Sequence, residues 1–558
     1  MAVIPPLTAW MLGPAGFLEA ERFFWPKALI VAAAVCVLAA RRLFSSRADS
    51  PQWVLVGAGT LALWGHLGVG LWSGALSREP WGAVAERLLP LACAGVWYAA
   101  MVPHCHKPRV QRRLRIAVWV AASGVAAVAL CEAMGLRLPW ALVRRPVSTL
   151  GGRNQVAAYV GFVLPLVMAS LLRRPGPLAW GTTTLLTLVV LLTRARSVWL
   201  GLLLTGVVAF SWGWERVLRR GWSPRVPGLL ATASALGTAV LLALGLPWHG
   251  LNWNESNPLT SSLQRLVEHD QGTGRGRLEQ LGVGLAIARD APLLGDGPGG
   301  WNDASARRAH VVSGRHAEAW GDDAAPRSEF VRALVETGLL GTTALLITVG
   351  FFVQARWKNW RRFALPPAAA CALLVFVVHA LLDLPLTRPD TALLVATIAA
   401  LAGPRRASIR LPSAVARGSA LLALIGIGGT ACLGAGYYFT AVTRPVSDTW
   451  AMARAVRWIP RLEVAERLAL QLARDEGCFA ARTALADARG RAPHHTGLLC
   501  LAAACARDAG EPGLEKAAYE SALRVEPHLR TPLTPAGTVG LCAPRVKPSR
   551  PATASPLP

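Results

Sequence analysis

The segment Gln155-Val-Ala-Ala-Tyr-Val-Gly-Phe-Val-Leu-Pro-Leu-Val-Met-Ala-Ser-Leu-Leu172 contains no charged residue and is followed at once by Arg173 and Arg174. A second uncharged segment, Pro177–Leu192, comes almost directly afterwards. Both segments approach the roughly 17–25 apolar residues that a helix needs to cross a hydrocarbon core of about 30 Å. A basic pair between two such segments is typical of a cytoplasmic loop. This stretch therefore predicts two membrane-spanning helices joined by a short loop.

The composition extends this interpretation to the whole chain of 558 residues. Hydrophobic residues make up 53% and charged residues only 16%, which is below the usual share in soluble proteins. The formal net charge of +26 arises from 58 Lys and Arg against 32 Asp and Glu. Because these basic residues lie in short clusters between apolar segments, we interpret them as orientation signals and expect no nucleic-acid partner.

The apolar segments predict an all-α, polytopic membrane helix bundle of about 12 transmembrane helices. The predicted spans are Trp25–Ala40, Trp53–Trp72, Gly82–Val102, Leu114–Met134, Gln155–Leu172, Pro177–Leu192, Ser197–Trp214, Gly228–Leu246, Phe330–Phe352, Leu365–Leu382, Thr391–Ala402 and Gly418–Tyr438. Residues 1–246 thus hold helices 1–8, residues 247–328 form a large loop, and residues 329–442 hold helices 9–12. The proline-broken segment Ala2–Ala20 is predicted to lie at the interface, and no cleavable signal peptide is expected.

The short loops differ strongly in basic charge. One alternating set carries 22 Lys and Arg residues and the other set carries 8. The richer set is predicted to face the cytoplasm, which places the large loop and the C-terminal tail on the outer side of the membrane. The Arg residues on that outer side are the more informative ones, because they oppose the orientation bias.

The composition after Val442 changes to an Ala-, Leu-, Arg- and Glu-rich helical pattern. Pro460, Pro493 and Pro527 recur at nearly equal spacing, and each follows an amphipathic stretch. The pattern predicts a C-terminal tetratricopeptide-like helical domain at residues 446–530, with an undifferentiated helical hairpin as the alternative. Residues 531–558 are Pro-rich and predicted to be disordered. Because no CxxC pair or Cys/His ligand spacing occurs, we expect no metal site.

Four stretches carry polar groups at the outer ends of predicted spans. They are Thr149-Leu-Gly-Gly-Arg-Asn-Gln-Val-Ala-Ala-Tyr159, Thr193-Arg-Ala-Arg-Ser-Val-Trp-Leu-Gly201, Arg277-Leu-Glu-Gln-Leu281 with Asp290-Ala-Pro-Leu-Leu-Gly-Asp-Gly-Pro-Gly299, and Arg327-Ser-Glu-Phe-Val-Arg-Ala-Leu-Val-Glu-Thr-Gly-Leu-Leu-Gly341. A fifth, weaker one is His379-Ala-Leu-Leu-Asp383-Leu-Pro385, in which we expect a structural hydrogen bond between His379 and Asp383, one helical turn later. In this order, the stretches resemble the motifs of the O-antigen ligase and O-antigen polymerase superfamily of bacterial inner-membrane glycosyltransferases. The resemblance covers about residues 145–405.

The resemblance implies transfer of a glycan from a polyprenyl-pyrophosphate carrier to an acceptor on the periplasmic side. It implies that Arg196 and Arg277 contact the pyrophosphate, and that Arg153, Asn154, Arg194 and Arg327 are further substrate-binding candidates. Guanidinium groups suit this task, because they stay charged and bind phosphate oxygens through two hydrogen bonds. No cofactor is expected besides the lipid-linked donor.

The sequence departs from the family at one motif. The helix that re-enters the membrane usually begins with a His-Asn pair, and Arg327 and Ser328 stand here instead. The base for the acceptor hydroxyl is therefore sought among His310, His316 and Glu329.

Simpler explanations stand beside these roles. Arg194 and Arg196 are also consistent with snorkelling at a span end, and Arg153 and Asn154 with capping the fifth span. At the level of the whole protein, the alternatives are an anion transporter-like membrane protein and a catalytically silent relative whose repeats recruit an assembly partner. The expected partners are the lipid bilayer, the polyprenyl-pyrophosphate glycan and a protein bound by the tail.

Overall fold

A computed structural model provides the structure of the chain. It describes residues 19–44, 53–77, 81–105, 107–136, 146–220, 226–246, 251, 273–301, 304–305, 326–360, 368–402, 408–439, 449–459, 462–491 and 496–525. The described helices divide into two compact units, of which the first holds α2 to α16 and the second holds α17 to α21. Residues 531–558 of the predicted Pro-rich tail lie outside the described residues.

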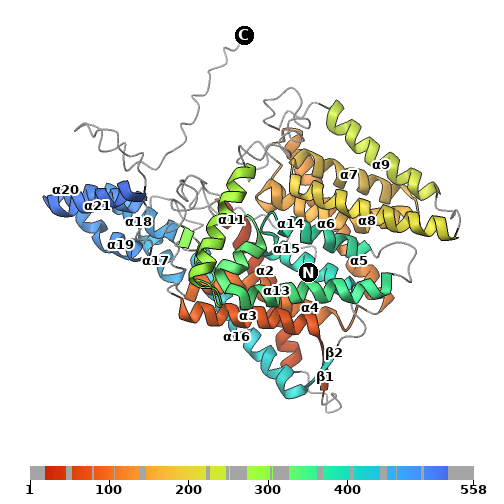
Figure 1. Cartoon of the computed structure of the whole chain (residues 1–558), viewed down its shortest axis with the longest axis horizontal. Coiled ribbons are helices and arrows are strands. Elements are labelled where there is room, and N and C mark those ends of the chain that lie inside the picture. Colours follow the sequence, from red (N-terminus) through yellow and green to blue (C-terminus); the bar gives the residue numbers. More distant parts are fainter. Residues whose placement is uncertain are drawn as a thin grey trace, which may run out of the picture. The chain divides into compact units, whose positions relative to one another are not determined.

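A helix occurs at each of the twelve predicted spans, which confirms the all-α class (Figure 1). These helices are α2 (Glu19–Phe44), α3 (Ala58–Leu76), α4 (Trp81–Met101), α5 (Pro108–Ala133), α6 (Arg153–Arg173), α7 (Pro177–Thr193), α8 (Arg196–Arg220), α9 (Val226–Gly245), α13 (Glu329–Trp360), α14 (Ala368–Ala380), α15 (Pro389–Ala402) and α16 (Ser413–Tyr437). The large loop contributes a further helix, α11 (Thr273–Asp290).

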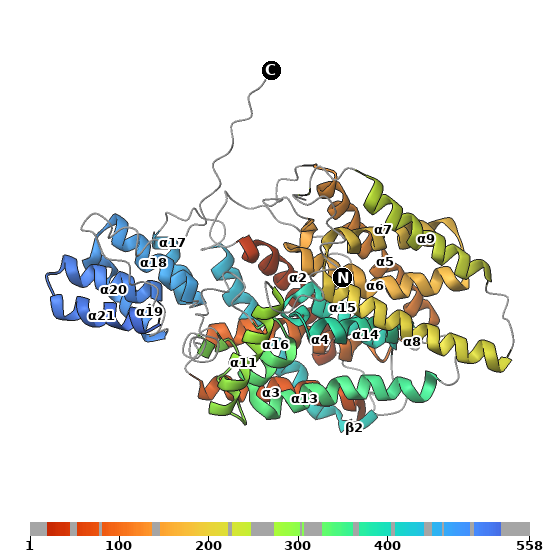
Figure 2. The same ribbon diagram turned by 45° about the horizontal axis from the view of Figure 1, so that its top comes forward.

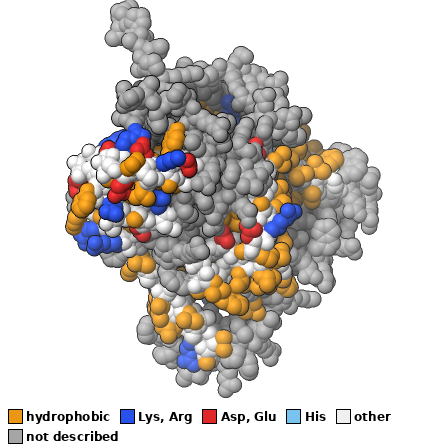
Figure 3. Space-filling view, turned by 60° about the vertical axis from the view of Figure 1, so that its left-hand side comes forward, with side chains coloured by type: hydrophobic (Ala, Val, Ile, Leu, Met, Phe, Trp, Pro, Cys, Tyr) orange, Lys and Arg blue, Asp and Glu red, His pale blue; other side chains and the backbone are white. Residues whose placement is uncertain are grey.

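The apolar character of these helices fits a membrane protein. Six of the described helices contain a stretch long and apolar enough to span a bilayer, and four more are apolar but shorter. Large apolar side chains such as Leu203, Phe210 and Leu422 are mostly exposed on the first unit. Figure 3 shows hydrophobic side chains gathered in a broad patch on the face it presents. A surface of this kind requires an apolar solvent, which a lipid bilayer provides.

The second predicted span begins differently from the prediction. Residues Trp53–Gly57 form a strand, β1, rather than the first turns of a helix, and β1 pairs antiparallel with β2 (Ser408–Pro412). Trp53 and Val54 start a β-branched and aromatic run that suits a strand. Pairing with β2 favours the strand over a helix at these residues. The pairing of β1 with β2 joins two loops that the count of basic residues predicts to lie on the same, cytoplasmic side.

The core of the first unit is built around α6. Thirteen residues of α6 are buried, and they pack with α5, α7 and α14 into one hydrophobic cluster. The short helices α14 and α15 lie among helices from both halves of the chain, as both ribbon views show (Figure 2). Phe162 of α6 packs edge-on against Phe376 and against the His379 ring of α14. This contact brings the end of α14 into the centre of the bundle.

Helix α13 is broken at Gly338, whose φ is 62° and ψ −164°. A Cβ at this position would lie 2.3 Å from the carbonyl group of Leu293, so only glycine fits. The break exposes carbonyls that the loop segment 292–299 satisfies, because Asp296 N–H donates to Val335 O and Gly297 N–H to Glu336 O. The predicted Gly-Pro-Gly turn is therefore fastened to the start of α13.

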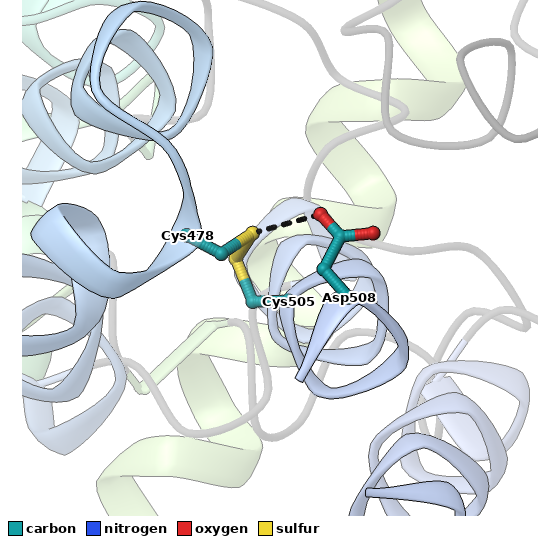
Figure 4. Close-up of a disulfide and its surroundings, with 3 residues drawn as sticks. All are labelled: Cys478, Cys505 and Asp508. Carbon is teal, nitrogen blue, oxygen red and sulfur yellow. Dashed lines mark hydrogen bonds between the residues drawn. A yellow bond between two sulfur atoms is a disulfide. The ribbon is translucent and has the colours of Figure 1, made fainter. Parts of the chain in front are cut away.

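The second unit is helical, as predicted for residues 446–530. It contains α17 (Thr449–Trp458), α18 (Leu462–Asp475), α19 (Cys478–Arg491), α20 (Thr496–Asp508) and α21 (Pro512–Val525). Three of these helices end two residues before the recurring prolines, as expected for a residue that cannot continue a helix. A disulfide joins Cys478 of α19 to Cys505 of α20, with the carboxylate of Asp508 beside it (Figure 4).

Candidate functional site

A tight turn places Arg196 at the first position of α8. Helix α7 ends at Thr193, and Arg194 takes a left-handed conformation with a φ of 54°. The carbonyl of Ala195 then accepts the N–H groups of Val198 and Trp199, so the next helix starts at once. Arg194 and Arg196 are both half-buried at this corner.

Arg277 lies in the first turns of α11 and is half-buried. Burial lowers the pKa of its guanidinium, Asp383 opposes this shift, and the positive charges of Arg327 and Arg196 add to it. Four charged groups from four separate parts of the sequence therefore lie within electrostatic reach of one another. We call Arg196, Arg277, Arg327 and Asp383 the outer cluster. Two members, Arg196 and Arg277, are the predicted pyrophosphate ligands.

Arg327 is fixed by the same helix that carries Arg277. The Arg327 N–H donates to Oε1 of Gln280 over 3.2 Å, and Gln280 is buried one turn after Arg277 on α11. This hydrogen bond ties the beginning of α13 to α11. It holds the residue that replaces the family's His next to the predicted phosphate ligands.

Asp383 is the member that the sequence analysis did not propose for chemistry. Its Oδ1 accepts the N–H of Leu384 over 2.9 Å, whereas its Oδ2 is buried without a hydrogen-bond partner in the described structure. The Nε of Arg277 is likewise buried without a hydrogen-bond partner. Buried polar atoms are nearly always paired, so this carboxylate oxygen and this guanidinium N–H can each bond a polar group that enters the cluster.

A serine and a histidine lie behind Asp383. Nδ1 of His379 is 2.9 Å from Oγ of Ser197, and its Nε2 is 3.9 Å from Oδ2 of Asp383. Both Ser197 and His379 are buried. The expected hydrogen bond between His379 and Asp383, one helical turn apart, is too long at this distance. The His379-x-x-x-Asp383 spacing at the end of an apolar segment was the sequence signal for this part of the site.

Glu329, one of the predicted bases, has both carboxylate oxygens engaged. Oε1 accepts the N–H of Leu386 over 2.6 Å, and Oε2 lies 3.1 Å from Nη2 of Arg332. Arg332 also lies 3.8 Å from Glu336, so one guanidinium group faces two carboxylates. A role as proton acceptor would require Glu329 to give up one of these contacts.

Of the remaining predicted residues, two lie at the start of α6 and two lie outside the described residues. Arg153 is exposed and Asn154 half-buried at the start of α6, where the N-cap residue Gly152 provides no side-chain cap. His310 and His316 lie outside the described residues. Among the described residues, no group of three His, Cys, Asp or Glu side chains could hold a metal ion.

The outer cluster combines three guanidinium groups with one carboxylate. Such a group of charges favours an anion with about two negative charges, and the half-buried setting strengthens the attraction relative to bulk water. The open Oδ2 of Asp383 adds an acceptor for a hydroxyl proton at the same place. The site can therefore hold a dianion beside a hydroxyl group.

One family model matches part of this chain. Residues 181–346 match the family model described as O-Antigen ligase, a range that includes Arg196, Arg277 and Arg327. The search of curated proteins found no match. Residues 181–346 are therefore similar to an O-antigen ligase domain, in agreement with the superfamily that the motifs resemble.

Proposed function

We propose that this protein is a membrane glycosyltransferase that moves a glycan from a polyprenyl-pyrophosphate carrier to an acceptor hydroxyl. The O-antigen ligase domain supports the reaction class. The observation that carries the proposal is the outer cluster, in which Arg277 lies with Arg196, Arg327 and Asp383. The pyrophosphate diester of such a carrier has two negative charges, and with Asp383 ionised the three guanidinium groups balance the total negative charge.

In this reaction, the acceptor oxygen bonds to the anomeric carbon, and the bond from that carbon to the phosphate oxygen breaks. The electron pair of the broken bond stays on the polyprenyl pyrophosphate, whose negative charge grows as it leaves. Guanidinium groups already aimed at this position stabilise the growing charge without reorganisation, which is an effective form of transition-state stabilisation. Arg196, Arg277 and Arg327 have this role in our proposal.

Asp383 Oδ2 is the proposed acceptor of the hydroxyl proton. A carboxylate beside a bound pyrophosphate is positioned to take this proton as the oxygen attacks. His379 lies next to this carboxylate, and Ser197 contacts the other nitrogen of the His379 ring. This assignment supplies a base although Arg327 stands where the family usually has a His.

We further propose that the tail lies on the periplasmic side. The disulfide between Cys478 and Cys505 supports this location, because disulfides form and persist in oxidising compartments and are rare in the cytosol. The helix starts also support a tetratricopeptide arrangement. Leu462 and Thr496 are 34 residues apart, as are Cys478 and Pro512, and 34 residues is the length of that repeat. A protein partner of the polysaccharide machinery is the proposed occupant of the repeats.

The experiment is glycan transfer by purified protein in detergent, with a polyprenyl-pyrophosphate glycan and a panel of acceptors comprising a lipid core, an oligosaccharide and a peptide. Detergent micelles sustain no gradient, so transfer there supports an enzyme and excludes an anion transporter as the sole function. If a correctly folded protein transfers glycan to none of the acceptors, the silent-relative interpretation takes its place.

A further inference from the structure

The turn that leads into α6 has an unusual buried conformation. Ser148 is fully buried with a φ of 49°, and Gly151 has a φ of 80°. The Ser148 N–H donates to Oε2 of Glu132 over 2.7 Å, and its hydroxyl donates to the carbonyl of Val125 over 2.8 Å. A non-glycine residue in the left-handed region persists only where the surroundings hold it. The turn 148–152 is thus held by α5 on one side.

Lys27 of α2 holds the same turn from the other side. Its ammonium group is 1% exposed, donates to the carbonyl of Thr149 and lies 3.2 Å from Oδ2 of Asp390. Asp390 is in the first turn of α15 and is also buried. One ammonium group therefore connects three elements: α2, the turn before α6 and the start of α15.

The start of α15 continues the segment that carries Asp383. Between Asp383 and Asp390, the chain is fixed at Leu386 by Glu329 of α13 and at Asp390 by Lys27. Arg388, in the same segment, lies close enough to Lys27 for the two positive charges to repel. The segment 383–390 begins with Asp383, the proposed base, and Lys27 fixes its other end at Asp390.

A buried ion pair is a poor source of stability. Desolvation of the two charges offsets most of their attraction, so replacing such a pair by apolar side chains of similar size is often neutral or stabilising. We therefore expect the Lys27–Asp390 pair to add little to the stability of the bundle. The contact with Thr149 O gives the pair a different task, because it joins the turn before α6 to the segment that carries Asp383.

We propose that Lys27 is a positioning residue, which locks the turn 148–152 to the segment 383–390 and so holds Asp383 and the start of α6 in register for the donor. The inference rests on the proposed function. It assigns a role in the reaction to the first described helix, which contributes no motif residue.

The test compares two folded variants in the detergent transfer assay. Lys27→Met/Asp390→Leu removes both charges of the pair and is expected to keep the melting temperature of the wild type. Its kcat is expected to fall about tenfold to a hundredfold, as for a small misplacement of a catalytic group. Thr397→Val is the matched control, because it removes a buried hydrogen bond between α15 and Trp97 of α4 and should leave transfer unchanged.

A second measurement reads the turn directly and needs no activity. Thr149 is 4% exposed, so Thr149→Cys, in a chain whose other free cysteines are replaced, should react slowly with a maleimide in membranes. The reaction should be at least about tenfold faster when Lys27→Met/Asp390→Leu is added, and Thr397→Val should not change it.

The two assays separate the possible failures. Wild-type protein without transfer refutes the proposed function, while the labelling rates still decide whether Lys27 holds the turn. Active wild type together with a folded double variant of equal kcat, or equal labelling with and without Lys27, overturns the positioning role.

Discussion

Replacing Arg277 by Met removes the cation at the centre of the outer cluster. The pKa of Arg277 is lowered in the folded protein, so its charged form is less favourable there than in the unfolded chain. Arg remains charged at every pH in the working range, so this charge destabilises the fold throughout that range, and Asp383 offsets only part of the effect. The Met variant should therefore be as stable as the wild type or more stable, by about 1 kcal/mol or less for a half-buried side chain.

The activity should change in the opposite direction. Loss of one donor to a developing charge costs about 2.7–4 kcal/mol of transition-state stabilisation, so transfer should fall roughly a hundredfold to a thousandfold. Arg277→Lys should keep part of the activity if charge dominates and little if two-point binding of phosphate dominates. Arg289→Met, an exposed substitution near the end of the same helix, is the matched control and should leave transfer unchanged.

The assay measures thermal unfolding with and without polyprenyl pyrophosphate, together with the initial rate of transfer. Saturating carrier at about 100 times its Kd should stabilise the wild type by about 2.7 kcal/mol, and this ligand-induced gain should be much smaller in Arg277→Met. A variant that is less stable than the wild type without ligand, or that gains as much from the carrier, would refute the assignment of Arg277 as a buried anion ligand.

Four further predictions concern the base and the tail. Asp383→Asn keeps the acceptor for Leu384 N–H and should lower kcat about a hundredfold to ten-thousandfold with little change in the KM of the donor; a rate within twofold of wild type would exclude it as the base. Cys478→Ser should lower the free energy of unfolding of the tail by about 2–4 kcal/mol, seen as earlier protease cleavage, and labelling of both cysteines in unreduced wild type would show that the bond is absent in cells. A single cysteine at Ala484, in a chain without other cysteines, should react with an impermeant thiol reagent in intact spheroplasts; reaction only after lysis would reverse the proposed orientation. Deleting residues 446–558 should leave the membrane unit folded and weaken recovery of a bound partner, and full activity and chain-length control in cells would reject the recruitment role.

The positions of the helices were largely predictable because long apolar segments leave few alternatives in a bilayer. The strand at Trp53–Gly57 was missed, since its residues are apolar enough for a span and only the distant partner Ser408–Pro412 favours the strand. The break at Gly338 was missed for the same reason, because the loop that satisfies its carbonyls lies about 40 residues earlier.

The site was likewise predicted only in part. The motif residues Arg196 and Arg277 were predicted, and their proximity follows from the fold. Asp383 was assigned a structural hydrogen bond with His379, which is the usual partner at that spacing. Nδ1 of His379 bonds Ser197 of α8, whereas Nε2 is 3.9 Å from Asp383 Oδ2, too far for a hydrogen bond. This geometry depends on the packing of α8 against α14. Spacing along one helix could not reveal it.

The bond that is broken provides the most direct test of the central claim. In a single-turnover reaction with purified protein and a doubly labelled polyprenyl-pyrophosphate glycan, we expect one polyprenyl pyrophosphate released for each glycan joined to the acceptor, and no such products from Arg277→Met. Release of polyprenyl monophosphate would contradict the proposed glycosyl transfer at the outer cluster. So would a wild-type reaction in which the donor stays intact long after one turnover should be complete.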